Sequence, residues 1–143
     1  MEKRGAVLAF DFGTRRIGIA TGEWETRLAH PLEVIDAEDN LTRFARIAAL
    51  IEVWQPIGLV VGLPLSPEGG ETDLSRRAQR FAKQLHGRFS LPITLVDERL
   101  TSQDADQSLR EAGVRARCRR GVEDSVAAQR ILEDHFAHEP ALA

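Results

Sequence analysis

Three carboxylate residues lie where predicted strands end or a predicted helix begins. Asp11 and Glu98 each follow a short apolar run, and Asp124 lies in the first turn of a helix expected over about 122–136. In a parallel α/β layer such positions gather at the carboxyl edge of the sheet. Oxygen ligands without partnered His or Cys favour Mg²⁺ or Mn²⁺ over zinc. Two such ions can activate water and stabilise the leaving oxygen, so the acids predict metal-dependent hydrolysis of phosphodiester bonds.

Each acid also has an ordinary structural interpretation. An Asp just before a glycine turn is common turn chemistry, and Asp124 on a packing face could be a late helix cap or the partner of an arginine. Asp97 precedes Glu98 on the same strand and should face the opposite way, so Glu98 is the predicted ligand. The triplet from Asp11 to Gly13 imitates a kinase signature, but the other kinase motifs are missing.

Arginine supplies 17 of the 19 basic residues, which suits bidentate contacts to phosphate. A codon bias, or an ordinary solvated surface, would produce the same pattern. The candidate contacts to nucleic acid lie at a predicted turn, on a helix face, after a strand and in a loop expected over 113–121: Arg15, Arg16, Arg76, Arg80, Arg99, Arg115, Arg117, Arg119 and Arg120.

The amino-terminal third is predicted to form three strands in a meander. Apolar residues 6–10 and 17–21 form a hairpin, in which Gly13 and Gly18 allow another group to approach the backbone closely. Residues 28–35 alternate around Pro31, which suits an edge strand. The later elements are a helix capped by Asp39 or Asn40, a buried strand over 57–61, a turn-rich loop over 62–70, a helix capped by Thr72 or Asp73, a strand over 92–96, and a helix from Thr101 or Ser102 to about Ala112.

Helical spacing predicts the buried face of three helices. The first is expected to bury Leu41, Phe44, Ala45, Ala48 and Ile51, and the second Leu74, Ala78, Phe81, Ala82 and Leu85. The last helix places Asp124, Ala127, Ala128, Ile131 and His135 on one face, where the small alanines allow close approach to a sheet. His135 and His138, close to the carboxyl terminus, are nevertheless interpreted as surface residues rather than metal ligands.

Composition favours a single cytoplasmic domain over 1–138 with a short tail over 139–143. The net charge of −3 gives no global case for nucleic-acid binding, so such binding must rest on local patches. The single cysteine excludes an internal disulfide, and charged residues near the amino terminus leave no apolar core for a signal peptide. No membrane-length apolar run is present, so no membrane partner is expected.

Four motifs in order along the chain resemble the YqgF/RuvX family. They are Asp11-Phe-Gly-x-x-Arg16-Ile-Gly-Ile-Ala20, Gly62-Leu-Pro64, Asp97-Glu-Arg-Leu-Thr101-Ser102 and Asp124-Ser-x-Ala-Ala128. Members are bacterial RNase H-like proteins, described as Holliday junction resolvases and as the nuclease that matures the 5′ end of pre-16S rRNA. The resemblance implies a five-stranded mixed sheet whose first three strands are antiparallel, flanked by helices. It also implies that Asp11, Glu98 and Asp124 bind the metal.

One position departs from the wider superfamily. The resemblance implies a glutamate at the end of the fourth strand in resolvases of the RuvC type. This chain has Gly62 at that position. The acid after the fifth strand replaces that glutamate, or the metal site is weakened.

The leading hypothesis is a hydrolase that processes the 5′ end of pre-16S rRNA, with pre-rRNA and the pre-ribosomal particle as partners and a monomer or weak homodimer as its state. The alternatives are a dimeric Holliday junction resolvase acting on branched DNA, and a non-catalytic RNA-binding assembly factor. An actin-like ATPase is disfavoured, because 143 residues leave no second lobe to close over a nucleotide.

Overall fold

A computed structural model describes residues 4–98 and 116–138, with the side chains of residues 116–123 left out. Five strands form one sheet in the order β3-β2-β1-β4-β5. The elements in chain order are β1 (Ala6–Phe12), β2 (Arg16–Glu23), β3 (Leu28–Asp36), α1 (Asn40–Trp54), β4 (Gly58–Leu63), α2 (Asp73–Phe89), β5 (Ile93–Asp97) and α4 (Ala116–His138).

The sheet is mixed, as predicted. β1, β2 and β3 pair antiparallel, whereas β4 pairs parallel with both β1 and β5. β3 is an edge strand, and the pairing of β2 with β3 shifts register between Ile19 and Ala20, where Ala20 pairs with Pro31. Proline is tolerated at such an irregular edge because it has no N–H to donate to a ladder.

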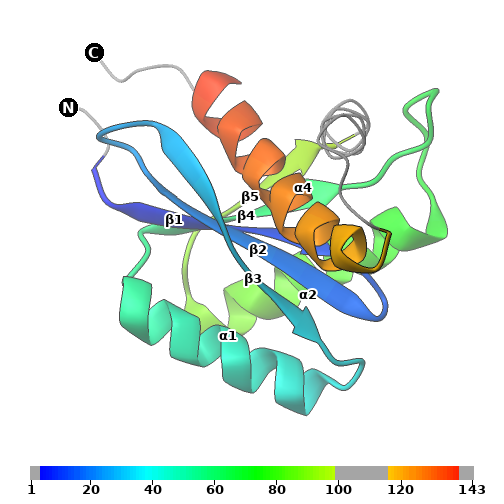
Figure 1. Ribbon diagram of the computed structural model, residues 1–143, viewed down its shortest axis with the longest axis horizontal. Coiled ribbons are helices and arrows are strands. Elements are labelled where there is room, and N and C mark those ends of the chain that lie inside the picture. Colours follow the sequence, from blue (N-terminus) through cyan, green and yellow to red (C-terminus); the bar gives the residue numbers. More distant parts are fainter. Residues whose placement is uncertain (1–3, 99–115, 139–143) are drawn as a thin grey trace.

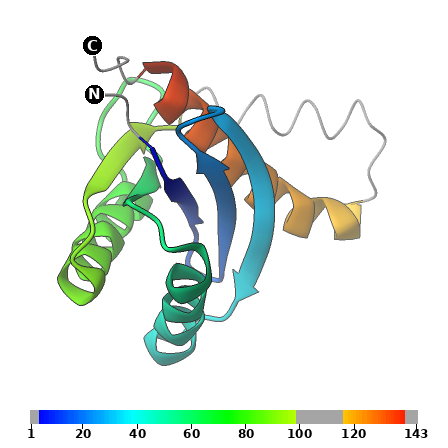
Figure 2. The same ribbon diagram turned by 90° about the vertical axis from the view of Figure 1, so that its left-hand side faces the viewer.

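Helices cover both faces of the sheet (Figure 2). α1 and α2 lie on one face, over a core that includes Leu8, Phe10 and Phe81. α4 crosses the other face, over a core that includes Val7 and Ala9. Alternate residues of β1 therefore contribute to opposite cores, as the pleat of a strand requires.

The amino-terminal ends of α1, α2 and α4 lie on the same side of the molecule as the turn between β1 and β2 (Figure 1). Asp39 caps α1 by accepting from Thr42 N, and Thr72 caps α2 through a reciprocal capping box with Ser75. The Thr72 hydroxyl also donates to Pro64 O at 2.8 Å, which ties the loop after β4 to the start of α2. The carboxyl edge of the parallel strands is thus built from well-fixed segments.

Most of the predicted packing faces are confirmed, but in α1 the prediction is right only for Phe44, which is buried, and Ile51, which packs against the core. Leu41 is 84% exposed, and Ala45 and Ala48 are also exposed, whereas Phe44, Ile47 and Leu50 are buried. Large apolar side chains gain more from burial than alanine does, so they set the rotation of the helix. In α2, Ala78, Phe81, Ala82 and Leu85 are buried as predicted, and Leu74 is half-buried.

Two predictions about the carboxyl-terminal segment are also wrong. α4 begins at Ala116, so residues 116–121 are helical rather than part of a loop. Ala and Arg are good helix formers, and Gly121 costs only about 1 kcal/mol relative to alanine within a helix. His135 is buried at 8% exposure, with its ring 5.2 Å from that of Trp24, so it is not a surface residue. The helix predicted up to Ala112 lies outside the described residues.

Within the described residues, no helix is both long and apolar enough to cross a membrane.

Candidate active site

Asp11 lies on the face of the sheet that α4 covers. Val7 and Ala9 belong to the core beneath α4, and Asp11 continues this alternation at the end of β1. The side chain of Phe12, the next residue, packs instead on the α2 side, with its ring 5.0 Å from that of Phe81. The strand therefore delivers one carboxylate to the α4 side of the carboxyl edge.

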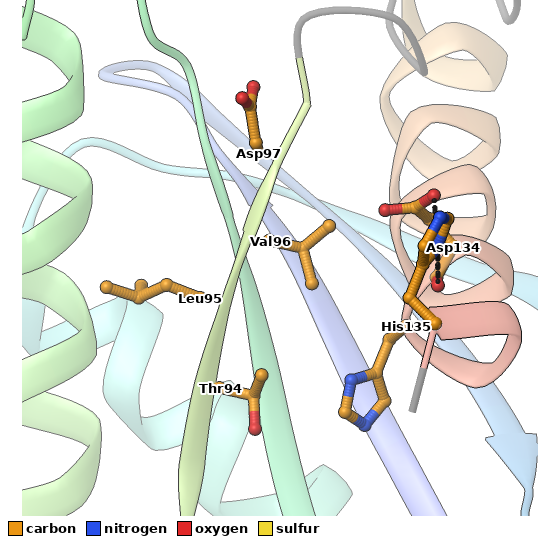
Figure 3. Close-up of a pocket in the computed structure, with 7 residues that line it drawn as sticks. Thr94, Leu95, Val96, Asp97, Asp134 and His135 are labelled. Carbon is orange, nitrogen blue, oxygen red and sulfur yellow. Dashed lines mark hydrogen bonds and ion pairs between the residues drawn. The ribbon is translucent and has the colours of Figure 1, made fainter. Parts of the chain in front are cut away.

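Glu98 reaches the same side from β5. Val96 points toward α4 and Leu95 away from it (Figure 3), so Glu98, two residues after Val96, lies on the α4 side. Glu98 is buried at 8% exposure, and its carboxyl group is hydrogen-bonded to that of Asp11. Its carboxylate lies over Gly62, in the space that a Cβ at that position would need.

Asp124 is brought to the site by a close contact between α4 and β2. Gly18 pairs with Asp11 across the hairpin, and the main chain of Asp124 lies directly against Gly18, where no Cβ could fit. Buried Ala127 and Ala128 complete this close approach. The prediction that Gly18 admits another group to the backbone is confirmed, and the group is α4.

The Asp124 carboxylate is also paired with an arginine. Arg16 Nε donates to Asp124 Oδ2 at 2.8 Å, and the two side chains are 28% and 25% exposed. One structural interpretation weighed for Asp124, an ion pair with arginine, is therefore observed. The pair also makes Arg16 a neighbour of the acids.

The electrostatics of the three acids reflect their proximity. Burial raises the pKa of Asp11 well above its usual value, and the charge and hydrogen bond of Glu98 and the charge of Asp124 raise it further. Burial also raises the pKa of Glu98, as does the charge of Asp97, while the hydrogen bond from Asp11 acts in the opposite direction. A proton shared between the two carboxyl groups accounts for their direct contact.

The donor set fits a hard divalent cation, although the carboxylates are not arranged around one. Among the described residues, no group of three His, Cys, Asp or Glu is spaced to share a metal ion. Asp11 and Glu98 meet directly, and Asp124 is held by Arg16. Because a cation between carboxylates removes their repulsion and the cost of burying them, these oxygen ligands suit Mg²⁺ or Mn²⁺.

The structure describes the side chains of only some of the arginines predicted to contact nucleic acid. Arg15 is exposed at the hairpin turn, 3.8 Å from Asp36, and Arg76 and Arg80 are exposed on α2. The remaining ones lie outside the described residues or, in α4, outside the described side chains: Arg99, Arg115, Arg117, Arg119 and Arg120.

Sequence reasoning missed Arg43, which fixes the turn after Asp11. Arg43 is buried in α1, and its Nη2 donates to Gly13 O and Thr14 O, both at 2.8 Å, while Nε donates to Ala37 O. Little in the sequence signals this role, because Arg43 lies among other polar residues, Thr42 and Arg46, in the first turns of the helix.

A hollow of about 240 Å³ between β5 and α4 is separate from the three acids. It is lined by Asp97 and Asp134 (Figure 3) and by His138, among others, and His138 Nδ1 lies 3.0 Å from Asp134 Oδ1. The acid cluster lies instead where β1, β4 and β5 end.

Comparison with known proteins decides the family. Residues 5–138 match the family model described as "RuvX: Holliday junction resolvase". The chain belongs to the RuvX family. A protein of Methylobacillus flagellatus is 54% identical over 94% of this chain and 92% of its own length, and one of Nitrosomonas eutropha is 52% identical over 92% and 84%. Both are named "Putative pre-16S rRNA nuclease".

The fold comparison places this RuvX chain with RuvC. The structure of Thermus thermophilus RuvC in complex with a Holliday junction substrate superposes with a TM-score of 0.57, at 14% identity, over 92% of this chain and 93% of RuvC. At that identity the likeness concerns the fold, which is the RNase H-like arrangement of a mixed five-stranded sheet and flanking helices. The predicted family and fold class are both confirmed.

Proposed function

We propose that this RuvX protein is a metal-dependent nuclease that processes the 5′ end of the 16S rRNA precursor. The observation that carries the proposal is the convergence of Asp11, Glu98 and Asp124 from three distant segments at one sheet edge. Relatives about half identical over nearly their whole length carry the corresponding name. A buried carboxylate pair is costly to maintain, so its presence favours a chemical role.

In this proposal Asp11, Glu98 and Asp124 hold Mg²⁺ or Mn²⁺. When bound, such ions supply an activated water and stabilise the leaving oxygen of the phosphodiester. The protein contributes rigid placement, because Asp11 sits inside a paired strand and Asp124 is fixed on β2 by the contact at Gly18. Arg16 holds the Asp124 carboxylate at 2.8 Å and lies ready to contact a phosphate when it releases that carboxylate.

Cleavage of branched DNA is the second candidate, favoured by the description of the matching family model. A resolvase needs two active sites across a symmetric junction, and therefore a dimer. An RNA-binding assembly factor without turnover is the third candidate, favoured by the direct contact of Asp11 with Glu98. The proposed partners are pre-rRNA and the pre-ribosomal particle, with the protein acting in the cytoplasm as a monomer or weak homodimer.

One experiment separates the three functions. RNA carrying the 5′ junction of the 16S precursor and a four-way DNA junction are incubated with Mg²⁺ or Mn²⁺ and with wild type, Asp11→Asn, Asp124→Asn or Asp97→Asn. We expect RNA cleavage by wild type and by Asp97→Asn, whose acid is not among the three proposed metal ligands, and none by the other two variants. Cleavage of the junction alone would support the resolvase, and RNA binding without cleavage by any protein would support the assembly factor.

A further inference from the structure

A hollow of about 410 Å³ opens between the start of α1 and the first three turns of α2, on the sheet face opposite the acids. Phe12 and Phe81 contribute aromatic surface and Asn40 and Gln84 contribute amides. The remaining lining residues are charged: Asp73, Arg76, Arg77 and Arg80. Three guanidinium groups against one carboxylate make the hollow positively charged in a protein whose net charge is −3.

The three arginines are not equally committed to protein partners. Arg77 lies 3.2 Å from Asp73, and Arg76 lies 3.6 Å from Glu71, both as exposed pairs. Exposed pairs of this kind contribute little to stability and exchange readily for another anion. Across the described part of the chain, no ion pair involves Arg80, which is exposed on the same side of α2. The hollow therefore has positive charge available for a phosphate.

Phe12 offers a fixed aromatic surface beside that charge. Its ring packs 5.0 Å from the ring of Phe81 and lies under the guanidinium of Arg43, at 5.4 Å. The ring is only partly buried. Phe81 and Arg43 cover part of the ring, so a base would pack against the part that stays exposed, and amides such as those of Asn40 and Gln84 can hydrogen-bond base edges.

The hollow adjoins the candidate active site through the backbone of β1. Asp11 and Phe12 are consecutive, so their Cα atoms are about 3.8 Å apart, yet their side chains face opposite sides of the sheet. A strand that crosses the end of β1 can therefore place one phosphate at the acids and a neighbouring nucleotide in the hollow. We propose that this hollow binds one unpaired nucleotide of the RNA substrate, its phosphate held by Arg80 and Arg76 and its base against Phe12. This inference rests on the proposed nuclease function.

Binding measured without divalent metal tests the charge component. A fluorescein-labelled single-stranded oligoribonucleotide is titrated in EDTA against wild type, Arg80→Gln and, as the control, Lys83→Gln. Lys83 is exposed on α2 but does not line the hollow. We expect Arg80→Gln to bind about tenfold more weakly, as befits a lost hydrogen bond to a charged group. The slope of log affinity against log salt should fall by about 0.7 for the lost phosphate contact. Equal affinities and slopes for both variants would overturn the proposal.

Phe12→Leu tests the stacking component. Leucine keeps the apolar contact with Phe81 but offers no ring to a base. We expect about fivefold or greater loss of affinity for the single strand and little change for a hairpin duplex of the same sequence. The thermal unfolding midpoint of each variant shows whether the fold is retained, and ultraviolet crosslinking of a thiouridine-substituted strand to the peptide over 76–84 gives a readout independent of the substitutions. Equal loss for single strand and duplex, or crosslinks confined to other segments, would contradict the assignment.

The outcomes also separate this inference from the proposed nuclease. If Asp11→Asn still cuts RNA, the assignment of the acids fails while the metal-free binding result stands. If Arg80→Gln binds normally but Asp11→Asn is inactive, the nuclease stands and the nucleotide site in the hollow is wrong.

Discussion

The carboxylate of Glu98, carried by β5, fills the space above Gly62 that a side chain on β4 would otherwise occupy. An acid from one strand therefore reaches the end of its neighbour, because the neighbour has no side chain there. From the family resemblance, a RuvC-type resolvase is expected to carry a glutamate at that end of the fourth strand. The geometry favours the first of the two alternatives for this departure, replacement of that glutamate by the acid after the fifth strand.

Gly62→Ala should therefore damage the site more than the fold. The new methyl group would collide with the Glu98 carboxylate and with Ile131 Cδ1. We expect a loss of about 1–3 kcal/mol in the free energy of unfolding, typical of overpacking. A displaced Glu98 should also lower the rate of RNA cleavage on the order of 100-fold, since misplacement of a reacting group by about 1 Å has that effect. Denaturant unfolding and single-turnover cleavage measure the two effects.

Gly87→Ala is the matched control for this substitution. Gly87 is exposed in α2, and nothing lies within 4 Å of the position a Cβ would take. Alanine should raise stability by about 0.5–1 kcal/mol through helix propensity and leave cleavage unchanged. Similar cleavage rates for the two variants would contradict the role given to the space above Gly62.

Gly18→Ala should displace the turn of α4 that carries Asp124 from the sheet. The main chain of Asp124 occupies the position of the added methyl group, and backbone cannot move aside as a flexible side chain can. We expect a loss of about 3 kcal/mol or more in the free energy of unfolding. Gly58→Ala, at a β4 position where a Cβ would meet only Pro92 O at 3.6 Å, should be neutral or mildly stabilising. Equal stability of the two variants would show that α4 tolerates displacement.

The sequence was sufficient for the fold because its signals are local. Alternation within the meander, the caps at Asp39 and Thr72, and the continuous apolar strands each follow from neighbouring residues. The rotation of α1 was only partly predictable from spacing. Phe44 was placed correctly, but the choice of Ile47 and Leu50 over Leu41 as its buried neighbours depends on the facing side chains, such as Phe81 against Phe44.

The candidate site was predictable only in part. Glycines within strand patterns indicate close approach, and this signal correctly marked Gly18. Two contacts depend on packing between segments far apart in sequence. One is the pair of Asp124 with Arg16, and the other is the bond from Arg43 to the turn after Asp11. No pattern within either segment carries that information.

Arg16→Gln should weaken the metal-free protein and strengthen its response to metal. Loss of the part-buried pair with Asp124 should lower stability by about 1 kcal/mol. Asp124 then has no competing cation, so Mg²⁺ or Mn²⁺ should raise the unfolding temperature more in this variant than in wild type. Arg16→Lys, which retains the charge, is the control. A smaller response in Arg16→Gln would indicate that Arg16 supports metal binding rather than competing with it.

Asp11→Asn should change how the stability of the metal-free protein depends on pH. Because the pKa of Asp11 is raised in the folded state, the folded protein holds a proton that the unfolded chain releases. This stabilising contribution is fully present below the unfolded pKa of about 3.9 and is lost as pH rises through the folded pKa. Removing the carboxylate should therefore make the variant more stable than wild type at neutral pH, with the difference vanishing in acid. Urea unfolding in EDTA, from acid to neutral pH, measures the difference in the free energy of unfolding between the variant and wild type. A variant less stable than wild type at neutral pH would contradict the raised pKa.

Arg43→Met should loosen the turn that follows Asp11. The substitution keeps much of the apolar volume over Phe12 but leaves the carbonyls of Gly13, Thr14 and Ala37 without their donor. Leaving buried carbonyl groups unpaired should lower stability by about 2–4 kcal/mol.

Arg43→Lys separates the charge of Arg43 from its hydrogen bonds. Lysine retains the charge, but a single ammonium cannot reproduce the fork of donors that spans both segments, so it should recover only part of the loss. Amide hydrogen exchange gives the local readout, with protection falling most at Arg15 and Arg16 in Arg43→Met. Exchange that rises equally throughout β3 and α4 would instead indicate a global loss of stability. Selective exchange at the turn would show that α1, through one buried guanidinium, holds in place the segment that joins Asp11 to Arg16.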